Sequence, residues 1–322
     1  GGLVPRGGPN RQGPGDENRS GSPGARQAAD RATAAQNNTP RGARELPALN
    51  GLPAGPMQAI VSDPHNRKRV YVATADHGVY GIDDIVRLFE TGEGRFVHLN
   101  AGTPFAAGFI RNLAVDPHNP NILYALCTGT SIEEDPTTTW TGVWKGTRGH
   151  DGWTWKRTLE LERRLNSDLQ VTTIAGKTAV IVAGRPRVAG QQPGARSPDG
   201  QVFLSVDEGE SWKTVLTRRD ALALHPARHI TDRTEVEMTG LGAVDRHVFV
   251  SVIADEQKNG ISYLHGTVDG DDRVTWADFT DNFYYPRAYR TNVVQEEGET
   301  WLYVATMGSG AFRRNITGLI RQ

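Results

Sequence analysis

Three consecutive acidic residues, Glu133, Glu134 and Asp135, are the clearest candidates for catalysis in this chain of 322 residues. Glycoside hydrolysis needs two carboxyl groups, held about 5–5.5 Å or about 6.5–9.5 Å apart according to mechanism. The acidic run lies in a Pro/Thr-rich segment, Thr128–Thr141, and adjacent acids in such a segment are typical of solvated surface. We therefore assign no catalytic residue, and keep these three as the alternative set that a glycoside hydrolase would use.

A second group of residues combines aromatic rings with guanidinium groups, mainly in the segment Asp281–Arg290. Aromatic rings stack on sugar rings, and guanidinium groups make bidentate contacts with polar oxygen atoms. Long loops on a rigid scaffold are where binding tends to reside. We expect a ligand-binding surface made by Trp140, Arg185, Arg187, Tyr284, Tyr285, Arg287 and Tyr289. The alternative left open is that Tyr285 and Tyr289 are packing residues with satisfied hydroxyl groups.

Metal, cofactor and nucleophile chemistry finds little support in the sequence. A single cysteine, Cys127, excludes an internal disulfide and any multi-cysteine metal site, and its place beside an expected strand predicts a buried, inert thiol. The run Asp269–Asp272 lacks the twelve-residue ligand pattern of a calcium loop. No Gly-x-Ser-x-Gly elbow is present. We predict no metal and no cofactor.

The charge balance narrows the choice of partners. The chain has 36 basic and 37 acidic residues, so it offers no net attraction to nucleic acid or to an anionic membrane. No apolar run approaches the roughly 20 residues that cross a bilayer, so we predict no membrane span. The 30 arginines against six lysines point to a GC-rich bacterium.

Residues 1–44 are predicted to form a disordered leader or arm rather than a domain. Gly, Pro, Ala, Asn and Arg dominate them, and such a segment cannot offset an ordering entropy of about 1–2 kcal/mol per residue. The segment is basic, with seven arginines against three acidic residues. It is either a flexible linker or an arm that orders on a partner protein. Leu3–Gly7 resembles a thrombin cleavage sequence, which makes residues 1–8 a candidate cloning remnant.

Residues 45–322 repeat one β unit about every 53 to 68 residues. Asp63-Pro64-His65-Asn66 returns as Asp116-Pro117-His118-Asn119, each time between two runs of β-branched and aromatic residues. Because Asp63 and Asp116 recur with the unit, we interpret them as turn-forming residues and not as catalytic ones. Five copies with four short strands apiece match the blades of a propeller. Helical periodicity is confined to one or two turns within Asp83–Glu90.

One turn carries a recognisable signature. Ser205–Trp212 fits the pattern S-x-D-x-G-x-x-W, and Asp269 with Trp276 forms a looser copy. The chain thereby resembles the BNR or Asp-box repeat propellers, a superfamily that includes sialidases, xyloglucan-active hydrolases and sortilin-type receptors. The resemblance implies that the Asp accepts turn amides, the Gly has a positive φ and the Trp packs between blades. It assigns Ser205, Asp207, Gly209, Trp212, Asp269 and Trp276 to structure.

The predicted fold is all-β: a five-bladed propeller over residues 45–322. Leu49-Asn50-Gly51 mirrors Leu99-Asn100-Ala101, which follows the outer strand of the first copy. We therefore expect residues 45–49 to supply an outer strand that closes the ring, since open sheet edges are a liability. Six blades, with a divergent one around Arg218–Thr239, is the alternative.

In the resembling superfamily, binding sites lie on the propeller face opposite the Asp-box turns. We predict a non-catalytic extracytoplasmic module, secreted or periplasmic, that presents a loop-rich face to a protein partner or a glycan. Residues 1–44 would tether it in a larger complex. The alternative is a glycoside hydrolase, sialidase-like or glucan-active, using the acidic loop.

Overall fold

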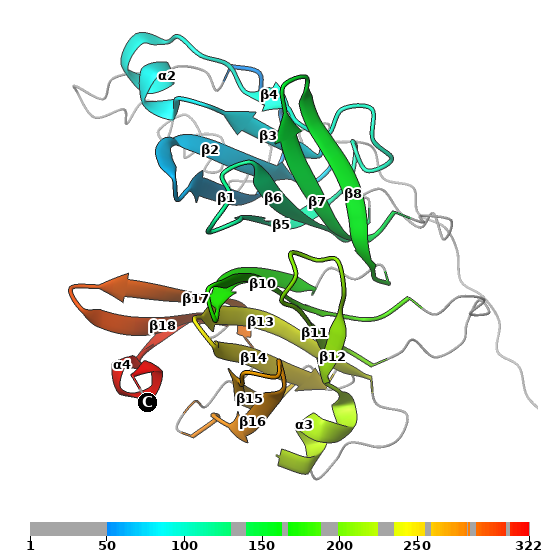
Figure 1. Ribbon diagram of the computed structural model, residues 1–322, viewed down its shortest axis with the longest axis vertical. Helices are drawn as coiled ribbons and strands as arrows, with labels where there is room; N and C mark the ends of the chain where they lie inside the picture. Colours follow the sequence, from blue (N-terminus) through cyan, green and yellow to red (C-terminus); the bar gives the residue numbers. More distant parts are fainter. Residues whose placement is uncertain are drawn as a thin grey trace, which may run out of the picture. The chain divides into compact units, whose positions relative to one another are not determined.

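Five antiparallel sheets follow one another along the chain in the computed structural model (Figure 1). The structure describes residues 50–129, 140–162, 167–187, 199–224, 235–254, 259–281, 283, 288–306 and 310–321. The helices and strands described below all belong to one compact unit, Pro47–Gln322.

Each sheet is one blade, and its strands pair in sequence order. Blade 1 holds β1 (Met57–Asp63), β2 (Asn66–Thr74), β3 (Val79–Ile82) and β4 (Val97–His98). Blade 2 holds β5 (Ile110–Val115), β6 (Ile122–Cys127), β7 (Gly142–Gly149) and β8 (Gly152–Glu160). Blade 3 holds β9 (Asp168–Ile174), β10 (Lys177–Gly184), β11 (Gln201–Ser205) and β12 (Lys213–Leu216). Blade 4 holds β13 (Val236–Val244), β14 (His247–Ala254), β15 (Asn259–Val268) and β16 (Val274–Asp278). Blade 5 holds β17 (Ala288–Glu296), β18 (Glu299–Thr306) and β19 (Ala311–Asn315).

The five blades confirm the predicted all-β propeller. The six-bladed alternative is wrong: the structure has five blades, and the described residues of Arg218–Thr239 form helix α3 (Arg218–Leu224) and the start of β13. Helix α2 (Ile85–Thr91) forms where helical turns were expected; the carboxylate of Asp84 caps it by accepting the N–H of Arg87 at 2.9 Å. A last short helix, α4 (Thr317–Ile320), follows β19.

The expected closing strand, residues 45–49, lies outside the described residues, as does the arm 1–44. No helix in the described ranges has the length and apolar character to span a bilayer.

The hydrophobic core is divided among the interfaces between successive blades. One buried cluster joins blades 1 and 2, one joins blades 2 and 3, one joins blades 3 and 4, and one joins blades 4 and 5. Strand β6 is packed on both faces, so all six of its residues are buried and its sequence is apolar without alternation. Cys127, its last residue, is buried as expected, and burial raises the pKa of its thiol to about 12.

The repeated Asp-Pro-His-Asn turns lock neighbouring blades together. Within its own blade, the Asp116 carboxylate accepts the backbone N–H groups of His118 and Asn119, at 2.8 and 3.0 Å. The histidine of each turn then reaches the next blade. His65 Nε2 lies 3.1 Å from the carbonyl oxygen of Asp116, and His118 Nε2 lies 3.1 Å from the hydroxyl of Thr173. These aspartates are therefore held in turns, and the repeat gains an inter-blade contact from its histidine.

The Asp-box of blade 3 is closed by its own side chains. Asp207 Oδ1 accepts the N–H of Ser211 at 2.9 Å, and Ser205 Oγ accepts the N–H of Gly209 at 2.8 Å. Gly209 has a φ of 87°, a left-handed value that favours glycine. The Trp212 indole donates to the Gly209 carbonyl oxygen at 3.1 Å. The looser copy keeps part of this pattern, since Asp269 Oδ1 accepts the N–H of Arg273 at 2.9 Å.

Tryptophans of fourth strands pin their blade to the preceding one. Trp155 of β8 donates to the carbonyl oxygen of Leu99 at 2.9 Å, and Trp276 of β16 donates to that of Val215 at 2.7 Å. Each ring lies over a third-strand glycine. A Cβ atom added at Gly146 would be 2.8 Å from the Trp155 ring, so glycine is required there.

Two buried histidines in blade 4 share a hydrogen bond. His247 Nδ1 and His265 Nε2 are 2.9 Å apart, and their rings stack with a centroid distance of 5.2 Å. Burial lowers the pKa of both, that of His265 to about 4, with Arg246 adding to the lowering at His247 and Asp245 opposing it. The folded state therefore holds both rings neutral.

Stability should fall on acidification because of this pair. The pKa of His265 is lower in the folded protein than the ordinary value of 6.5. Its contribution to the free energy of unfolding is therefore complete above pH 6.5 and is lost as the pH falls toward about 4. We expect the melting temperature of the wild type to drop between pH 6.5 and 4.5, and His265→Gln to reduce that drop. His150→Gln, at a ring 98% exposed, is the matched control and should leave the profile unchanged. Identical pH profiles for His265→Gln and the wild type would contradict this account.

Candidate functional site

The first strands of four blades carry a β-bulge, near the start of the strand in blades 1, 2 and 5 and at its middle in blade 4. The register shifts between Met57 and Ala59, Ile110 and Asn112, Thr239 and Gly242, and Ala288 and Arg290. The extra residues in blades 1, 2 and 5 are Gln58, Arg111 and Tyr289. Bulges redirect side chains and are common beside binding sites. The start of the first strands is therefore where a site is to be sought.

The buried carboxylate of Asp168, at the start of β9, joins four blades at this level. It accepts the amide of Asn112 from blade 2 at 2.9 Å and the backbone N–H of Leu241 from blade 4 at 3.0 Å. Arg290 of blade 5 forms an ion pair with it at 3.0 Å. Burial raises the pKa of Asp168, while Arg290 and the donated hydrogen bonds act to lower it. Every partner is a donor, which fits a carboxylate that accepts hydrogen bonds only.

From this carboxylate the contacts continue through Arg290 to a second arginine and a tyrosine. Arg290 also donates to the carbonyl oxygen of Arg111 at 2.7 Å. The Arg111 guanidinium lies 4.2 Å from the centre of the Tyr289 ring, so the bulged residues of blades 2 and 5 stack on each other. Burial, and then the charge of Arg290, lower the pKa of Arg111. These contacts hold the first strands of blades 2, 3 and 5 in fixed positions.

A cavity of 780 Å³ lies between the first strands of blades 1, 2, 3 and 5. Its polar lining consists mainly of amides, hydroxyls and one arginine: Gln58, Ser62, Asn112, Gln170, Arg290, Thr291 and Asn292. The side-chain amides of Gln58, Gln170 and Asn292 come from three blades and have no hydrogen-bond partner among the described residues. None of the residues that line this cavity in the described ranges has a carboxyl side chain. The cavity can thus bind an uncharged polar molecule through donors and acceptors together.

Arg185, predicted as a ligand-binding residue, is engaged in an ion-pair cluster. Its side chain is 2% exposed and contacts Glu235 at 2.8 Å and Glu237 at 3.1 Å, which joins blade 3 to blade 4. Arg187 lies two residues further on and is exposed. Of this pair, Arg187 has the accessibility that a ligand contact requires.

The other predicted ligand residues are placed as follows. Trp140 is half-buried beside Gly108 in the core of blades 1 and 2, and its carbonyl oxygen accepts the Trp144 indole N–H at 2.8 Å. Tyr289 stacks on Arg111 as described. The remaining predicted residues, catalytic and ligand-binding, lie outside the described residues: Glu133, Glu134, Asp135, Tyr284, Tyr285 and Arg287. Among the residues that the structure describes, no three His, Cys, Asp or Glu side chains are arranged to hold a metal ion.

The sequence analysis missed the cavity lining and its central carboxylate. A usable signal was present, because Gln58, Asn112, Gln170 and Asn292 each directly precede an apolar residue of a first strand. Polar residues at related places of successive first strands indicate that these strands line a shared polar space.

Comparison with known proteins shows the fold of this chain and does not show its activity. The sequence matches no protein-family model and no curated protein. Among solved structures it aligns with an ancestral GH74 enzyme at 23% identity and a TM-score of 0.69, over 84% of this chain and 36% of that one. The chain thus spans about a third of the enzyme's length. Identity at this level shows a shared fold, and at that level the resemblance to Asp-box propellers is confirmed.

Two further solved structures align less closely. YCF48 from Cyanidioschyzon merolae is 13% identical with a TM-score of 0.41, over 78% of this chain and 65% of that one. Trypanosoma rangeli sialidase in complex with the inhibitor DANA is 13% identical with a TM-score of 0.37, over 71% and 38%.

Replacing Asp168 should destabilise the whole propeller. Asp168→Asn removes the counter-charge of Arg290 and turns an amide NH₂ toward groups that are all donors. We expect a loss of about 3 kcal/mol in the free energy of unfolding, the usual cost of breaking a buried ion pair. Asp281→Asn is the matched control, because that carboxylate is 58% exposed and pairs with Arg314 at the surface; about 0.5 kcal/mol is expected there. Equal losses in urea-unfolding experiments on the two variants would show that Asp168 has no central role.

Proposed function

We propose that this chain is a non-catalytic binding module that holds a neutral glycan in the cavity between its first strands. The observation that carries the proposal is the set of three amides, Gln58, Gln170 and Asn292, that line the cavity without partners. An amide donates and accepts, and so matches the hydroxyl groups of a sugar in either role. The cavity volume of 780 Å³ falls within the range of about 300–1,000 Å³ typical of ligand pockets.

Rigid positioning supports binding by this cavity. The lining strands of blades 2, 3 and 5 are joined by Asp168, which binds both Asn112 and Arg290, and bulges in β1, β5 and β17 fix where the side chains of these three strands point. A site that is formed before the ligand arrives loses less conformational entropy on binding. The GH74 enzyme that shares the fold supports a carbohydrate as the ligand class.

Catalysis by the cavity is disfavoured by its chemistry. Hydrolysis of a glycoside needs two carboxyl groups at the ligand, and the described lining offers none. Asp168, the nearby carboxylate, is buried and saturated by donors. The alternative function is a glycoside hydrolase in which Glu133, Glu134 and Asp135 supply one or both of the two carboxyl groups.

The wider role that we propose is extracytoplasmic, secreted or periplasmic, since free glycans are met there. In this role the arm 1–44 tethers the propeller to a protein partner in a larger assembly. Its seven arginines against three acidic residues favour an acidic partner surface.

Binding can be tested with a panel of neutral oligosaccharides, followed by titration calorimetry on those retained. Gln170→Leu and Asn292→Leu should each weaken binding about tenfold, the effect of losing one or two hydrogen bonds to a buried ligand. Gln295→Leu is the matched control, because this amide lies on the same strand as Asn292 and outside the cavity lining. Unchanged affinity in both cavity variants would exclude this site.

The same samples distinguish the alternative function. Release of reducing sugar by the wild type, abolished in Glu133→Gln, Glu134→Gln or Asp135→Asn, would establish a glycoside hydrolase and overturn the non-catalytic proposal.

A further inference from the structure

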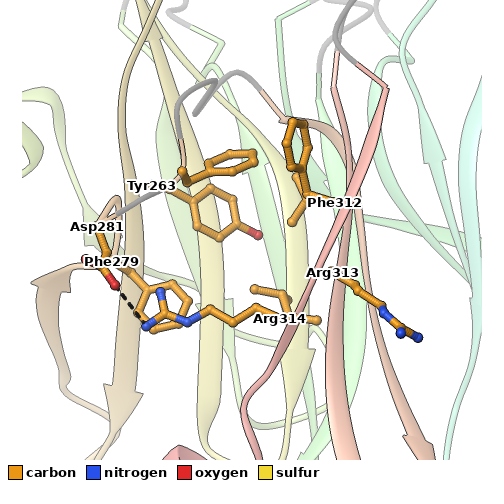
Figure 2. A pocket seen from close by; sticks show the side chains of 9 residues that line it. Tyr263, Phe279, Asp281, Phe312, Arg313 and Arg314 are labelled. Atoms are coloured by element: carbon orange, nitrogen blue, oxygen red, sulfur yellow. Dashed lines mark hydrogen bonds and ion pairs between the residues drawn. The ribbon is translucent and has the colours of Figure 1, made fainter.

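An aromatic groove of 280 Å³ lies between blades 4 and 5, away from the cavity of the first strands. Figure 2 shows Tyr263 and Phe312 facing the same hollow, with Arg314 extended along Phe279 toward Asp281. Phe283, Leu302 and Val304 complete the apolar lining. The floor is therefore hydrophobic, and the rim carries Arg313, Arg314 and Asp281.

The groove lies where blades 2 and 4 place a fourth-strand tryptophan. In blades 2 and 4, a third-strand glycine pairs with a residue that faces the preceding blade: Gly146 with Leu123, and Gly266 with Val248. Trp155 and Trp276 lie over these two glycines. In blade 5 the corresponding residue, Leu302, pairs with Arg314. The position that is glycine in blades 2 and 4 is thus an arginine here, and its guanidinium lies 4.2 Å from the centre of the Phe279 ring.

Blade 5 also presents an open sheet edge beside the groove. Its described strands are β17, β18 and β19, and within the described residues no strand pairs with the outer side of β19. Four of the five residues of β19 are exposed. An unpaired edge offers a row of backbone donors and acceptors to any extended chain.

The edge of β19 is positively charged, which favours an acidic partner. Arg313 stacks on Trp301 at 4.7 Å and has no carboxylate partner among the described residues. Arg314 pairs with Asp281 at 3.3 Å but remains 47% exposed. An acidic segment is complementary to this rim, whereas the chain's own leader, with seven arginines against three acidic residues, is not.

We propose that the groove and the edge of β19 together bind an extended, acidic segment of a partner protein. The segment adds a fourth strand to blade 5 and inserts one aromatic side chain into the groove beside Phe283, whose ring packs edge-on against both Tyr263 and Phe312. A flanking carboxylate pairs with Arg313. Main-chain hydrogen bonds supply affinity in this mode of binding, and the side-chain pocket supplies specificity. The inference rests on the proposed role in assembly and is independent of the glycan cavity.

The competing occupant is the chain's own segment 45–49. Its sequence, Glu-Leu-Pro-Ala-Leu, contains no aromatic residue for the pocket, and Pro47 lacks an N–H to donate to β19. These two features favour an external strand, and the experiment below separates the two occupants.

The probe is a fluorescent peptide of sequence Val-Thr-Trp-Ala-Asp-Phe, which copies the fourth strand of blade 4 and the residue after it, Val274–Phe279. We expect the full chain to bind it, and a peptide with Ser in place of Trp to bind about tenfold more weakly, since aromatic anchors dominate such contacts. Arg313→Glu should weaken binding of the probe about tenfold by reversing the rim charge. Arg273→Glu is the matched control, because that arginine is 80% exposed in a turn of blade 4.

Hydrogen exchange provides the second measurement. Addition of the peptide should slow exchange at the backbone amides of Ala311–Asn315 in the full chain and leave those of β1 unchanged. Absence of both binding and protection would overturn the proposal. A full-chain variant with Leu46→Pro and Leu49→Pro tests whether the chain's own segment 45–49 fills the groove. If the peptide binds this variant and not the wild type, that segment fills the groove and the proposal of an external partner is overturned. Either failure leaves oligosaccharide binding by the cavity unaffected, so the two proposals fall separately.

Discussion

The arrangement of the blades depends on one buried carboxylate. Asp168 belongs to blade 3 and accepts hydrogen bonds from blades 2, 4 and 5, so its two oxygens join four separate sheets. A charge buried at this depth is tolerated only when it is paired and fully hydrogen-bonded. Its donors must therefore stay in register with it, and three of them lie on first strands at or near a bulge. Satisfying this one group therefore fixes three of the four first strands that line the cavity, those of blades 2, 3 and 5.

The contacts at the two ends of the blades differ in kind. At the end that carries the Asp-Pro-His-Asn turns, similar contacts recur: an aspartate closes its own turn, and a histidine reaches the next blade. Where the first strands begin, the contacts differ from blade to blade, with Gln58, Arg111 and Tyr289 at corresponding bulges. A repeat can stabilise neighbouring blades with identical contacts, whereas a ligand needs different groups around it. The departures from the repeat are therefore where binding residues are found.

This division explains which features the sequence predicts. The turns at Asp63 and Asp116, the box at Ser205–Trp212 and the buried Cys127 depend on neighbours in the chain or on one repeat unit, so local patterns suffice. The stacking of Arg111 on Tyr289 joins positions far apart in sequence, and no spacing signals it. Arg185 and Trp140 were predicted to bind a ligand because contacts with distant residues cannot be read from the sequence. Their residue types suit a ligand, but Glu237 and Gly108, which come from distant segments, turn them toward structural contacts.

Blade 5 shows how one substitution in a repeat can create a surface. Glycine at the third-strand position of blades 2 and 4 leaves room for an indole ring from the fourth strand. An arginine there fills part of that room, stacks on the preceding blade and brings a positive charge to the edge of the sheet. A strand that docks here must leave this guanidinium in place, so its aromatic side chain enters the groove beside Phe283 and Phe312 rather than the space over the third strand that Trp155 and Trp276 fill in blades 2 and 4. The position of the arginine thus decides both where a docking side chain enters and which charge must accompany it.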